Sequence, residues 1–415
     1  MSTVVRPVVR RGRLPGSHSR AARTLLVTLL FWPTVCPQLL AADQAGGATE
    51  IAPADAWPMF RGSPSGSGRS AASLTPPLIE HWQRTIADTA FEATPVIADG
   101  TIYIGDLDGC FHALALDTGA TRWTFRSAAG FPGAAAISPE DSRRVVVGDA
   151  DGLVRALDAK TGTLLWEYRT EGEISGGPTI VGSGGEARVL VGSQDASLAC
   201  LDLADGSLRW KHTTADQIRC SPTIAAGLGC VAGCDGKLHL IDIQSGDEKA
   251  AVPIDGPTGT TPAADDGRVF FGTEGGVFFA IDLPRGVVLW RTEAAANGMA
   301  YRSSAAIAGT AAVVGSRRKA VEAFSLADGS RLWRRPMRGR VDASPVVVVT
   351  PSGRLLAIVG DTAGRIVSLD AADGSVTWEF EAGDGFASSP AVAAGRLVMA
   401  TEHGTIWCFR EPPLD

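Results

Sequence analysis

The sequence predicts an all-β protein, an eight-bladed β-propeller built from four-stranded antiparallel blades. Three observations lead to this prediction. A short motif ending in Trp recurs along the chain, its spacing is that of a propeller blade, and the two chain ends carry complementary parts of one further blade. The chain is also rich in turn residues, with 49 Gly and 24 Pro, as short strands joined by tight turns require.

The recurring motif reads "LDAKTGTLLW" in its clearest copy, which ends at Trp166. The copy ending at Trp123 is looser, and the copy ending at Ala250 lacks the Trp. Successive end positions are 43, 44, 40, 40, 43 and 45 residues apart. Within each unit, turns of the Asp-Gly and Thr-Gly type separate four short apolar segments, which is typical of a propeller blade. The motif ends at Trp123, Trp166, Trp210, Ala250, Trp290, Trp333 and Trp378.

The two ends of the repeat array predict how the ring closes. The last unit, residues 388–410, contains three strand patterns and stops before the Trp strand. The missing strand pattern surrounds Trp82, which precedes Trp123 by 41 residues. We therefore expect the N-terminal strand to complete blade 8, which removes the exposed sheet edges of an open array.

The repeated Trp is predicted to dock one blade onto the next. An indole buries about 150–250 Å², and its recurrence on the outer strand indicates a structural role rather than a catalytic one. Ala250 predicts a weaker joint beside blade 4. The predicted docking residues are Trp82, Trp123, Trp166, Trp210, Trp290, Trp333 and Trp378, seven of the ten Trp in the chain.

The N-terminus has the pattern of an export signal. Residues 1–42 hold six arginines and no acidic residue, and an apolar run over 24–40 leads to Ala41 and Ala42. Such a run followed by small residues is typical of a cleaved signal peptide. It is short for a transmembrane helix and contains two prolines. We expect a periplasmic or secreted protein, with a membrane anchor through an uncleaved signal as the alternative.

The charge of the remaining chain excludes one class of partner. Without those six arginines the 38 basic residues fall to 32 against 45 acidic ones, a formal charge of −13. Phosphate binding needs a basic surface, so we expect no nucleic-acid partner. The predicted organisation is an export signal over 1–42, a linker over 43–56, the propeller over 57–410 and a tail over 411–415.

Six cysteines follow the predicted signal. Cys200 and Cys408 occupy a repeat position that other blades fill with Ala, so we expect buried free thiols that pack as small apolar groups. Disulfides are compatible with export, and six cysteines allow 15 pairings, so the disulfide state stays open here. The six are Cys110, Cys200, Cys220, Cys230, Cys234 and Cys408.

On these repeat units and the motif "WPMFRG" at residues 57–62, the chain resembles the pyrroloquinoline-quinone (PQQ)-repeat β-propeller family. That family includes calcium-dependent quinoprotein dehydrogenases, BamB-like scaffolds of outer-membrane protein assembly, and sensor domains. Its dehydrogenases hold the quinone against a disulfide between adjacent cysteines, with Ca²⁺ on carboxylate and amide oxygens. This chain has no Cys-Cys pair and lacks long insertions in its turns.

The resemblance therefore favours the non-catalytic, BamB-like branch. It implies an exported monomeric scaffold that binds envelope or outer-membrane proteins, is not transmembrane after cleavage and needs no cofactor. The alternative is a PQQ- and Ca²⁺-dependent oxidoreductase, or a small-ligand sensor, that uses the top of the central channel.

Motifs for other chemistry are missing. The sequence contains no nucleophile elbow, P-loop or dinucleotide-binding glycine motif. His112 and His239 share one repeat position in blades 1 and 4, so we expect the histidines to lie apart. We predict no catalytic residue and no metal site.

Charged residues that break the repeat are the candidate binding residues, because repeated positions build the fold. They gather three residues before the Pro that opens each blade, at the predicted channel mouth. Either they are solvated loop charges that pair with one another, or they form a polar and aromatic funnel for a peptide, an anionic small molecule or a partner loop. The charged candidates at this position are Glu92, Arg219, Arg302 and Asp342; the adjacent aromatic candidates are Phe91, Phe131, Tyr301 and Phe386; the candidates from strand ends are Asp106, Asp149 and Asp361, with Arg317 and Arg318 in blade 6.

Overall fold

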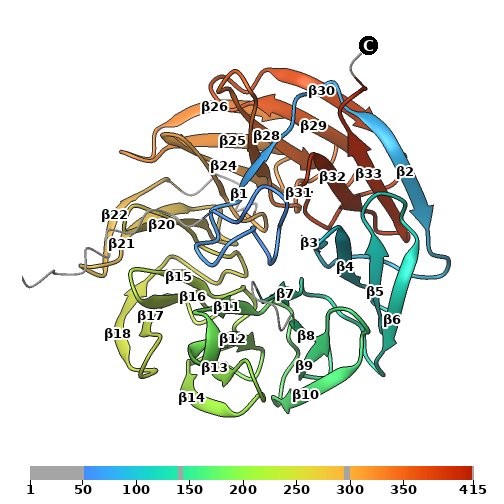
Figure 1. Ribbon diagram of the computed structural model, residues 1–415. Helices are drawn as coiled ribbons and strands as arrows, with labels where there is room; N and C mark the ends of the chain where they lie inside the picture. The colour runs from blue at the N-terminus through green and yellow to red at the C-terminus, as the bar shows by residue number, and fades with distance from the viewer. Residues whose placement is uncertain (1–50, 139–143, 294–299, 414–415) are drawn as a thin grey trace, which may run out of the picture. The chain divides into compact units, whose positions relative to one another are not determined.

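A computed structural model describes residues 51–138, 144–293 and 300–413. These residues form 33 strands and one short 3-10 helix (Gly184–Glu186). The strands make eight sheets that follow one another around a ring (Figure 1), seven of four strands and one of five. The predicted eight-bladed β-propeller is therefore confirmed.

Blades 1 to 4 follow the chain in order, each running from an inner to an outer strand. Blade 1 contains β3 (Val96–Ala98), β4 (Thr101–Gly105), β5 (Cys110–Ala115) and β6 (Thr121–Arg126). Blade 2 contains β7 (Ala136–Ile137), β8 (Arg144–Gly148), β9 (Leu153–Asp158) and β10 (Leu164–Arg169). Blade 3 contains β11 (Thr179–Val181), β12 (Arg188–Ser193), β13 (Ser197–Asp202) and β14 (Leu208–Thr213). Blade 4 contains β15 (Thr223–Ala225), β16 (Leu228–Ala232), β17 (Lys237–Asp242) and β18 (Glu248–Pro253).

Blades 5 to 8 complete the ring. Blade 5 contains β19 (Ala263–Asp265), β20 (Arg268–Gly272), β21 (Phe278–Asp282) and β22 (Val287–Arg291). Blade 6 contains β23 (Ala306–Ala308), β24 (Ala311–Ser316), β25 (Ala320–Ser325) and β26 (Arg331–Pro336). Blade 7 contains β27 (Val346–Val349), β28 (Leu355–Gly360), β29 (Arg365–Asp370) and β30 (Val376–Glu381), with β1 (Arg69–Ser73) added inside. Blade 8 contains β31 (Ala391–Ala393), β32 (Arg396–Ala400), β33 (Thr405–Arg410) and β2 (Ile79–Thr85).

The burial of the strands follows their position in the blade. The second strand of blade 1, β4, is buried at all five residues, whereas the outer strand β6 alternates between exposed and half-buried residues. A strand covered on both faces reads as a continuous apolar run, and a strand covered on one face alternates. The core therefore consists of apolar layers between neighbouring blades.

Blade 8 closes the ring as predicted. The N-terminal strand β2 pairs antiparallel with β33, with Trp82 opposite Cys408 and Thr85 opposite Thr405. The outer strand of this blade thus comes from the start of the chain and its other three strands from the end, as Figure 1 shows.

Blade 7 has a fifth strand that the repeat does not predict. Strand β1 pairs in parallel with the innermost strand β27, with Arg69 opposite Val347. The pairing continues the contact made by the Gly68 carbonyl, which accepts a hydrogen bond from the Val347 amide at 2.8 Å. The chain passes along β1 before it enters β2, because it has to travel from the ring axis to the rim of blade 8.

Six of the seven predicted docking indoles make one repeated contact. Each Nε1–H donates to a backbone carbonyl of the next blade. The residue with this carbonyl lies three residues before the glycine in the last turn of that next blade. At Gly206, whose φ is +75°, a Cβ would lie 2.5 Å from the Trp166 ring. The indole therefore packs directly on the turn glycine, where a larger residue would clash with it. The donor and acceptor pairs are Trp82–Leu116, Trp123–Ala159, Trp166–Leu203, Trp210–Ile243, Trp290–Leu326 and Trp333–Ala371, at 2.9–3.2 Å.

Two joints depart from this pattern. Trp378 lies edge-on against Phe409, with ring centroids 5.6 Å apart, because blade 8 closes on the N-terminal strand and has no turn glycine of the repeat. At the joint between blades 4 and 5, a Cβ on Gly286 would meet the Ala250 Cβ at 3.0 Å. A methyl group therefore stands there where other joints hold an indole.

The six described cysteines are free thiols, five of them buried and Cys234 half-buried. Burial raises the pKa of Cys200 to about 11 and that of Cys220 to about 12, so both thiols stay protonated. No helix within the described ranges has the length and apolar character needed to cross a membrane. The predicted export signal over 1–42 lies outside the described residues.

Candidate functional site

The predicted channel mouth is a pocket of about 150 Å³ on the ring axis. It is lined by one residue from the same repeat position of all eight blades, three before the position at which six of the blades have their opening Pro. The structure thus brings Glu92, Arg219, Arg302 and Asp342 together around one opening. Glu92, Arg219 and Arg302 are exposed, and Asp342 is half-buried.

The charges at the mouth are partly paired. Arg317 donates through Nε and Nη2 to both carboxylate oxygens of Asp342, at 2.9 and 3.0 Å. The Arg219 guanidinium donates to the side-chain carbonyl of Gln217. Arg302 lies 3.9 Å from a carboxylate oxygen of Glu274. Asp342 is therefore neutralised, whereas both arginines remain at the surface with weaker partners.

The aromatic ring at the mouth comes from a residue that the repeat does not predict. Phe60, from the "WPMFRG" motif, lines the mouth pocket together with the charged residues. The motif was recognised in the sequence as a family feature, but its position on the ring axis depends on the path of the chain.

The four aromatic candidates beside the mouth are core residues, and their prediction as a funnel is wrong. Phe91, Phe131, Tyr301 and Phe386 are at most 1% exposed. For three of them the physical reason is the glycine at the end of the preceding blade's second strand. A Cβ on Gly105, for example, would lie 2.3 Å from the Phe131 Cβ. The rings fill these gaps between blades and do not face the channel.

The candidate aspartates at the strand ends are also structural. Asp106, Asp149 and Asp361 are buried, and their carboxylates accept backbone N–H groups of the turn that follows. Burial alone would raise the pKa of Asp106, but hydrogen bonds from His112 and the Cys110 amide outweigh it and hold this pKa below its usual value. These carboxylates stabilise turns and are not available at the mouth.

Arg318 in blade 6 is likewise committed to the fold. It donates to the buried carboxylate of Glu322 at 2.8 Å and to the Tyr301 hydroxyl at 2.9 Å. Lys319 follows with a φ of +54°, at the position where most blades have the turn glycine. Of the two predicted arginines in this turn, Arg317 reaches the mouth through Asp342 and Arg318 points into the joint.

Below the mouth, hydroxyl groups join successive blades in a chain that we call the hydroxyl belt. In each link, a backbone N–H donates to the hydroxyl of the next blade, and the acceptors are buried. Five joints are linked in this way, from blade 4 through blade 8 to blade 1. The links are Ser221 to Thr261, Thr261 to Ser304, Ser304 to Ser344, Ser344 to Ser389 and Ser389 to Thr94, at 2.8–3.3 Å.

The N-terminal segment 54–70, the axial segment, closes the other end of the channel. Its carbonyls accept backbone N–H groups from the inner strands of six blades, among them Ala264 to Ser65 and Ile307 to Ser67, and from Ala394 just after the inner strand of blade 8. Arg61 is 1% exposed and donates to the Ala305 carbonyl at 2.8 Å, while burial lowers its pKa to about 9. The segment therefore fills the ring axis and is part of the core.

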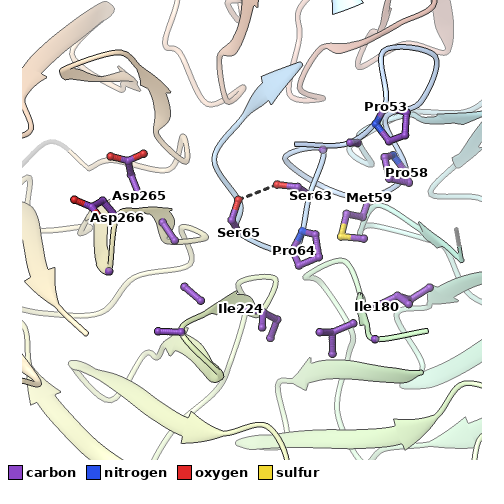
Figure 2. Close-up of a pocket in the computed structure, with 18 of the residues that line it drawn as sticks. Pro53, Pro58, Met59, Ser63, Pro64, Ser65, Ile180, Ile224, Asp265 and Asp266 are labelled. Atoms are coloured by element: carbon purple, nitrogen blue, oxygen red, sulfur yellow. Dashed lines mark hydrogen bonds between the residues drawn. The ribbon is translucent and has the colours of Figure 1, made fainter. Parts of the chain in front are cut away.

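Blade 3 is the exception, and a second pocket lies there. In the described residues, the axial segment forms no backbone hydrogen bond to Ile180 of blade 3. The pocket beside it measures about 620 Å³ and is lined mostly by apolar groups. Figure 2 shows Met59, Pro64 and Ile180 around it, with Asp265 and Asp266 at one side.

The expectation that the histidines lie apart is wrong for one pair. His212 on β14 and His239 on β17 belong to adjacent blades, and their ring centroids are 6.1 Å apart. Glu248 on β18 lies beside both, 2.6 Å from His239 Nδ1 and 3.8 Å from His212 Nε2. The comparison of equal repeat positions missed this pair, because the two histidines occupy different positions of their blades.

The mouth does not fit the quinone and calcium that the resemblance suggests as an alternative. Drug-sized ligands occupy pockets of about 300–1,000 Å³, at least twice the volume found here. Calcium takes six to eight oxygen ligands, whereas Asp342 is already bound by Arg317, and two further arginines line the opening.

Comparison with solved structures finds the same fold at low sequence identity. BamB from Moraxella catarrhalis shares 18% identity, with 80% of this chain and 100% of that chain covered and a TM-score of 0.67. Quinohemoprotein alcohol dehydrogenase from Comamonas testosteroni shares 14%, with 87% and 82% covered and a TM-score of 0.68. A europium-containing methanol dehydrogenase shares 12%, with 86% and 98% covered and a TM-score of 0.71.

Sequence comparison identifies the family. None of the curated proteins matches the sequence. One family, described as outer membrane protein assembly factor BamB, matches four overlapping stretches, 79–219, 150–249, 222–345 and 317–411. Together these stretches span nearly the whole propeller, and they include the repeat units on which the resemblance rests. The chain therefore belongs to the BamB family of PQQ-repeat β-propellers.

Proposed function

We propose that this protein is an exported, non-catalytic scaffold that binds a protein partner of the cell envelope at its channel mouth. The observation that carries the proposal is the form of the mouth, a shallow pocket with exposed Arg219, Arg302 and Glu92 on its rim. A pocket of about 150 Å³ accepts one side chain of a partner more readily than a cofactor with its substrate.

The charges at the rim suggest what that side chain is. Arg219 and Arg302 are exposed, and arginine is enriched among the anchor residues of protein interfaces. A guanidinium group binds a carboxylate through two parallel hydrogen bonds. We therefore propose that an acidic residue on a partner loop enters the mouth between the arginines, above the Phe60 ring.

Membership of the BamB family supports an envelope partner, because the family is described by its role in outer-membrane protein assembly. The predicted export signal over 1–42 supports a periplasmic or secreted location, with an uncleaved anchor as the alternative. We propose a monomer, since the ring closes within one chain.

Affinity capture from the cell envelope with charge-reversed variants tests the proposal. We expect Arg219→Glu and Arg302→Glu each to lose the captured partner, because each places a negative charge at the rim. Arg285→Glu is the matched control, because this arginine is also exposed but lies far from the mouth. It follows Pro284, which lines the larger pocket at the other end of the channel. An unchanged set of captured proteins in both mouth variants contradicts the proposal.

A titration with PQQ and Ca²⁺, followed by dye reduction with simple alcohols and sugars, tests the alternative. We expect neither saturable binding nor turnover. Saturable quinone binding with turnover would replace the scaffold proposal with an oxidoreductase.

A further inference from the structure

Two histidines and a glutamate meet at the joint between blades 3 and 4. His212 follows Trp210 by two residues on the outer strand β14, so its side chain points to the same side, towards blade 4. His239 is buried on β17, and Glu248 stands on the neighbouring outer strand β18. One possible ligand atom from each of the three lies within 4.8 Å of the others.

The distances suit a metal ion. In a tetrahedral zinc site with bonds of about 2.0–2.1 Å, two ligand atoms lie about 3.3 Å apart. The two distances that Glu248 Oε1 makes, 2.6 Å to His239 Nδ1 and 3.8 Å to His212 Nε2, bracket this value. Small side-chain movements would therefore bring all three atoms to one ion.

The orientation of His239 is already that of a metal ligand. Its Nε2 lies 2.9 Å from the carboxylate of Asp235, whose side chain is 4% exposed. A ligating histidine commonly donates its second ring N–H to a carboxylate, which fixes the ring and the tautomer. Because Nε2 is engaged by Asp235, Nδ1 is the ring atom of His239 that faces Glu248 and His212 and that can bind an ion between them.

Blade 1 offers an internal contrast. His112 has the same repeat position as His239, and its Nε2 contacts Asp106 at 2.9 Å. The third potential ligand there is Cys110, whose pKa is raised by burial, and the Asp106 carboxylate is occupied by backbone amides of the turn. In blade 4 that aspartate position is Gly233, and Asp235 supplies the carboxylate instead.

We propose that His212, His239 and Glu248 form a zinc-binding site that links blades 3 and 4, with Asp235 as the positioning residue of His239. Three protein ligands leave a fourth position. The Glu248 side chain is 35% exposed and the His212 side chain 16%, so this position is open to water or to a ligand from solution. Imidazole and carboxylate ligands together favour zinc over calcium or magnesium.

One physical consequence follows. Zinc that binds the folded protein and not the unfolded chain stabilises the folded state by mass action, and the bound ion also links blades 3 and 4.

Calorimetric titration of the purified protein with ZnCl₂ tests the proposal. We expect one zinc per chain, and a zinc-dependent rise of the thermal unfolding midpoint that EDTA reverses. His212→Ala and Glu248→Gln are expected to weaken binding by more than tenfold and to abolish the rise, and both positions are partly exposed, so the fold is retained. Asp235→Asn is expected to weaken binding by about 10–100-fold.

His403→Ala is the matched control, because His403 forms an exposed pair with Asp384 that could also attract a metal ion. This variant is expected to bind zinc as the unmodified protein does. The proposal is overturned if the unmodified protein binds no zinc, if binding persists in His212→Ala and Glu248→Gln, or if His403→Ala removes it.

Discussion

The joint between blades 2 and 3 is held near the rim, whereas the joint between blades 4 and 5 is held near the axis. At the first, Trp166 lies on Gly206 and donates to the Leu203 carbonyl at 3.0 Å. At the second, Ala250 replaces the indole, but the Ser221 amide donates to the Thr261 hydroxyl at 3.0 Å. The same repeat thus joins its blades by two different sets of contacts.

This comparison shows that docked indoles and belt hydrogen bonds are distributed unevenly around the ring. Blades 2 and 3 have Ala134 and Gly177 at the position that carries the belt hydroxyls, so their joint has no such acceptor. Several other joints, such as that between blades 6 and 7, have both an indole and a belt link. We therefore expect the joints without a belt link, including the joint between blades 2 and 3, to depend most on their Trp.

Removing that indole should have the largest effect. We expect Trp166→Ala to lower the free energy of unfolding by about 3–5 kcal/mol, because it leaves a cavity and exposes the surface around Gly206 of blade 3 on which the indole packs. Urea unfolding followed by Trp fluorescence and circular dichroism measures this change. A loss below about 1 kcal/mol would mean that the docked indole does not hold the joint.

The turn glycines sharpen the comparison without altering the Trp. Gly206→Ala should cost about 2–3 kcal/mol, because it combines a positive φ with a Cβ 2.5 Å from the Trp166 ring. Gly286→Ala, whose Cβ would lie 3.0 Å from the Ala250 methyl and near no indole, should cost about 1 kcal/mol, mainly from the backbone. Paired urea unfolding curves give the difference, and equal costs would contradict the role of the indole.

Restoring the indole tests the joint between blades 4 and 5. We expect Ala250→Trp to raise the free energy of unfolding by about 1–2 kcal/mol, through added apolar burial and a hydrogen bond to the Leu283 carbonyl, the equivalent of the Leu203 carbonyl. The same change at an exposed outer-strand position, Thr121→Trp, is the control. Destabilisation by Ala250→Trp would show that this joint has repacked around the alanine.

The belt link at this joint should have the smallest effect. Thr261→Val keeps the shape but removes the acceptor of the Ser221 amide, so it should cost about 1 kcal/mol. Thr121→Val, at an exposed position of β6, is the control. Thermal unfolding of both variants measures the cost, and equal midpoints would mean that water replaces the belt hydroxyl.

Much of the candidate site could not be predicted, for reasons that particular residues make clear. The mouth charges Glu92, Arg219, Arg302 and Asp342 share one repeat position, and that position is enough to place them around one opening. The aromatic residues one position earlier were assigned to the mouth as well. Their burial could not be read from their own blade, because it depends on the residues of the neighbouring blade against which they pack. For three of the four rings, the available signal was a glycine opposite the ring, such as Gly105 opposite Phe131.

The sequence by itself determined the fold, the number of blades, the closure by the strand around Trp82 and the role of the repeated indole, because each follows from a pattern repeated within one unit. Only the tertiary structure decided the path of the axial segment, the added strand β1, the hydroxyl belt and the meeting of His212 with His239. These features join residues of different blades at different repeat positions. A repeat specifies which residues are equivalent, whereas the packing of one blade on the next decides which unlike residues come into contact.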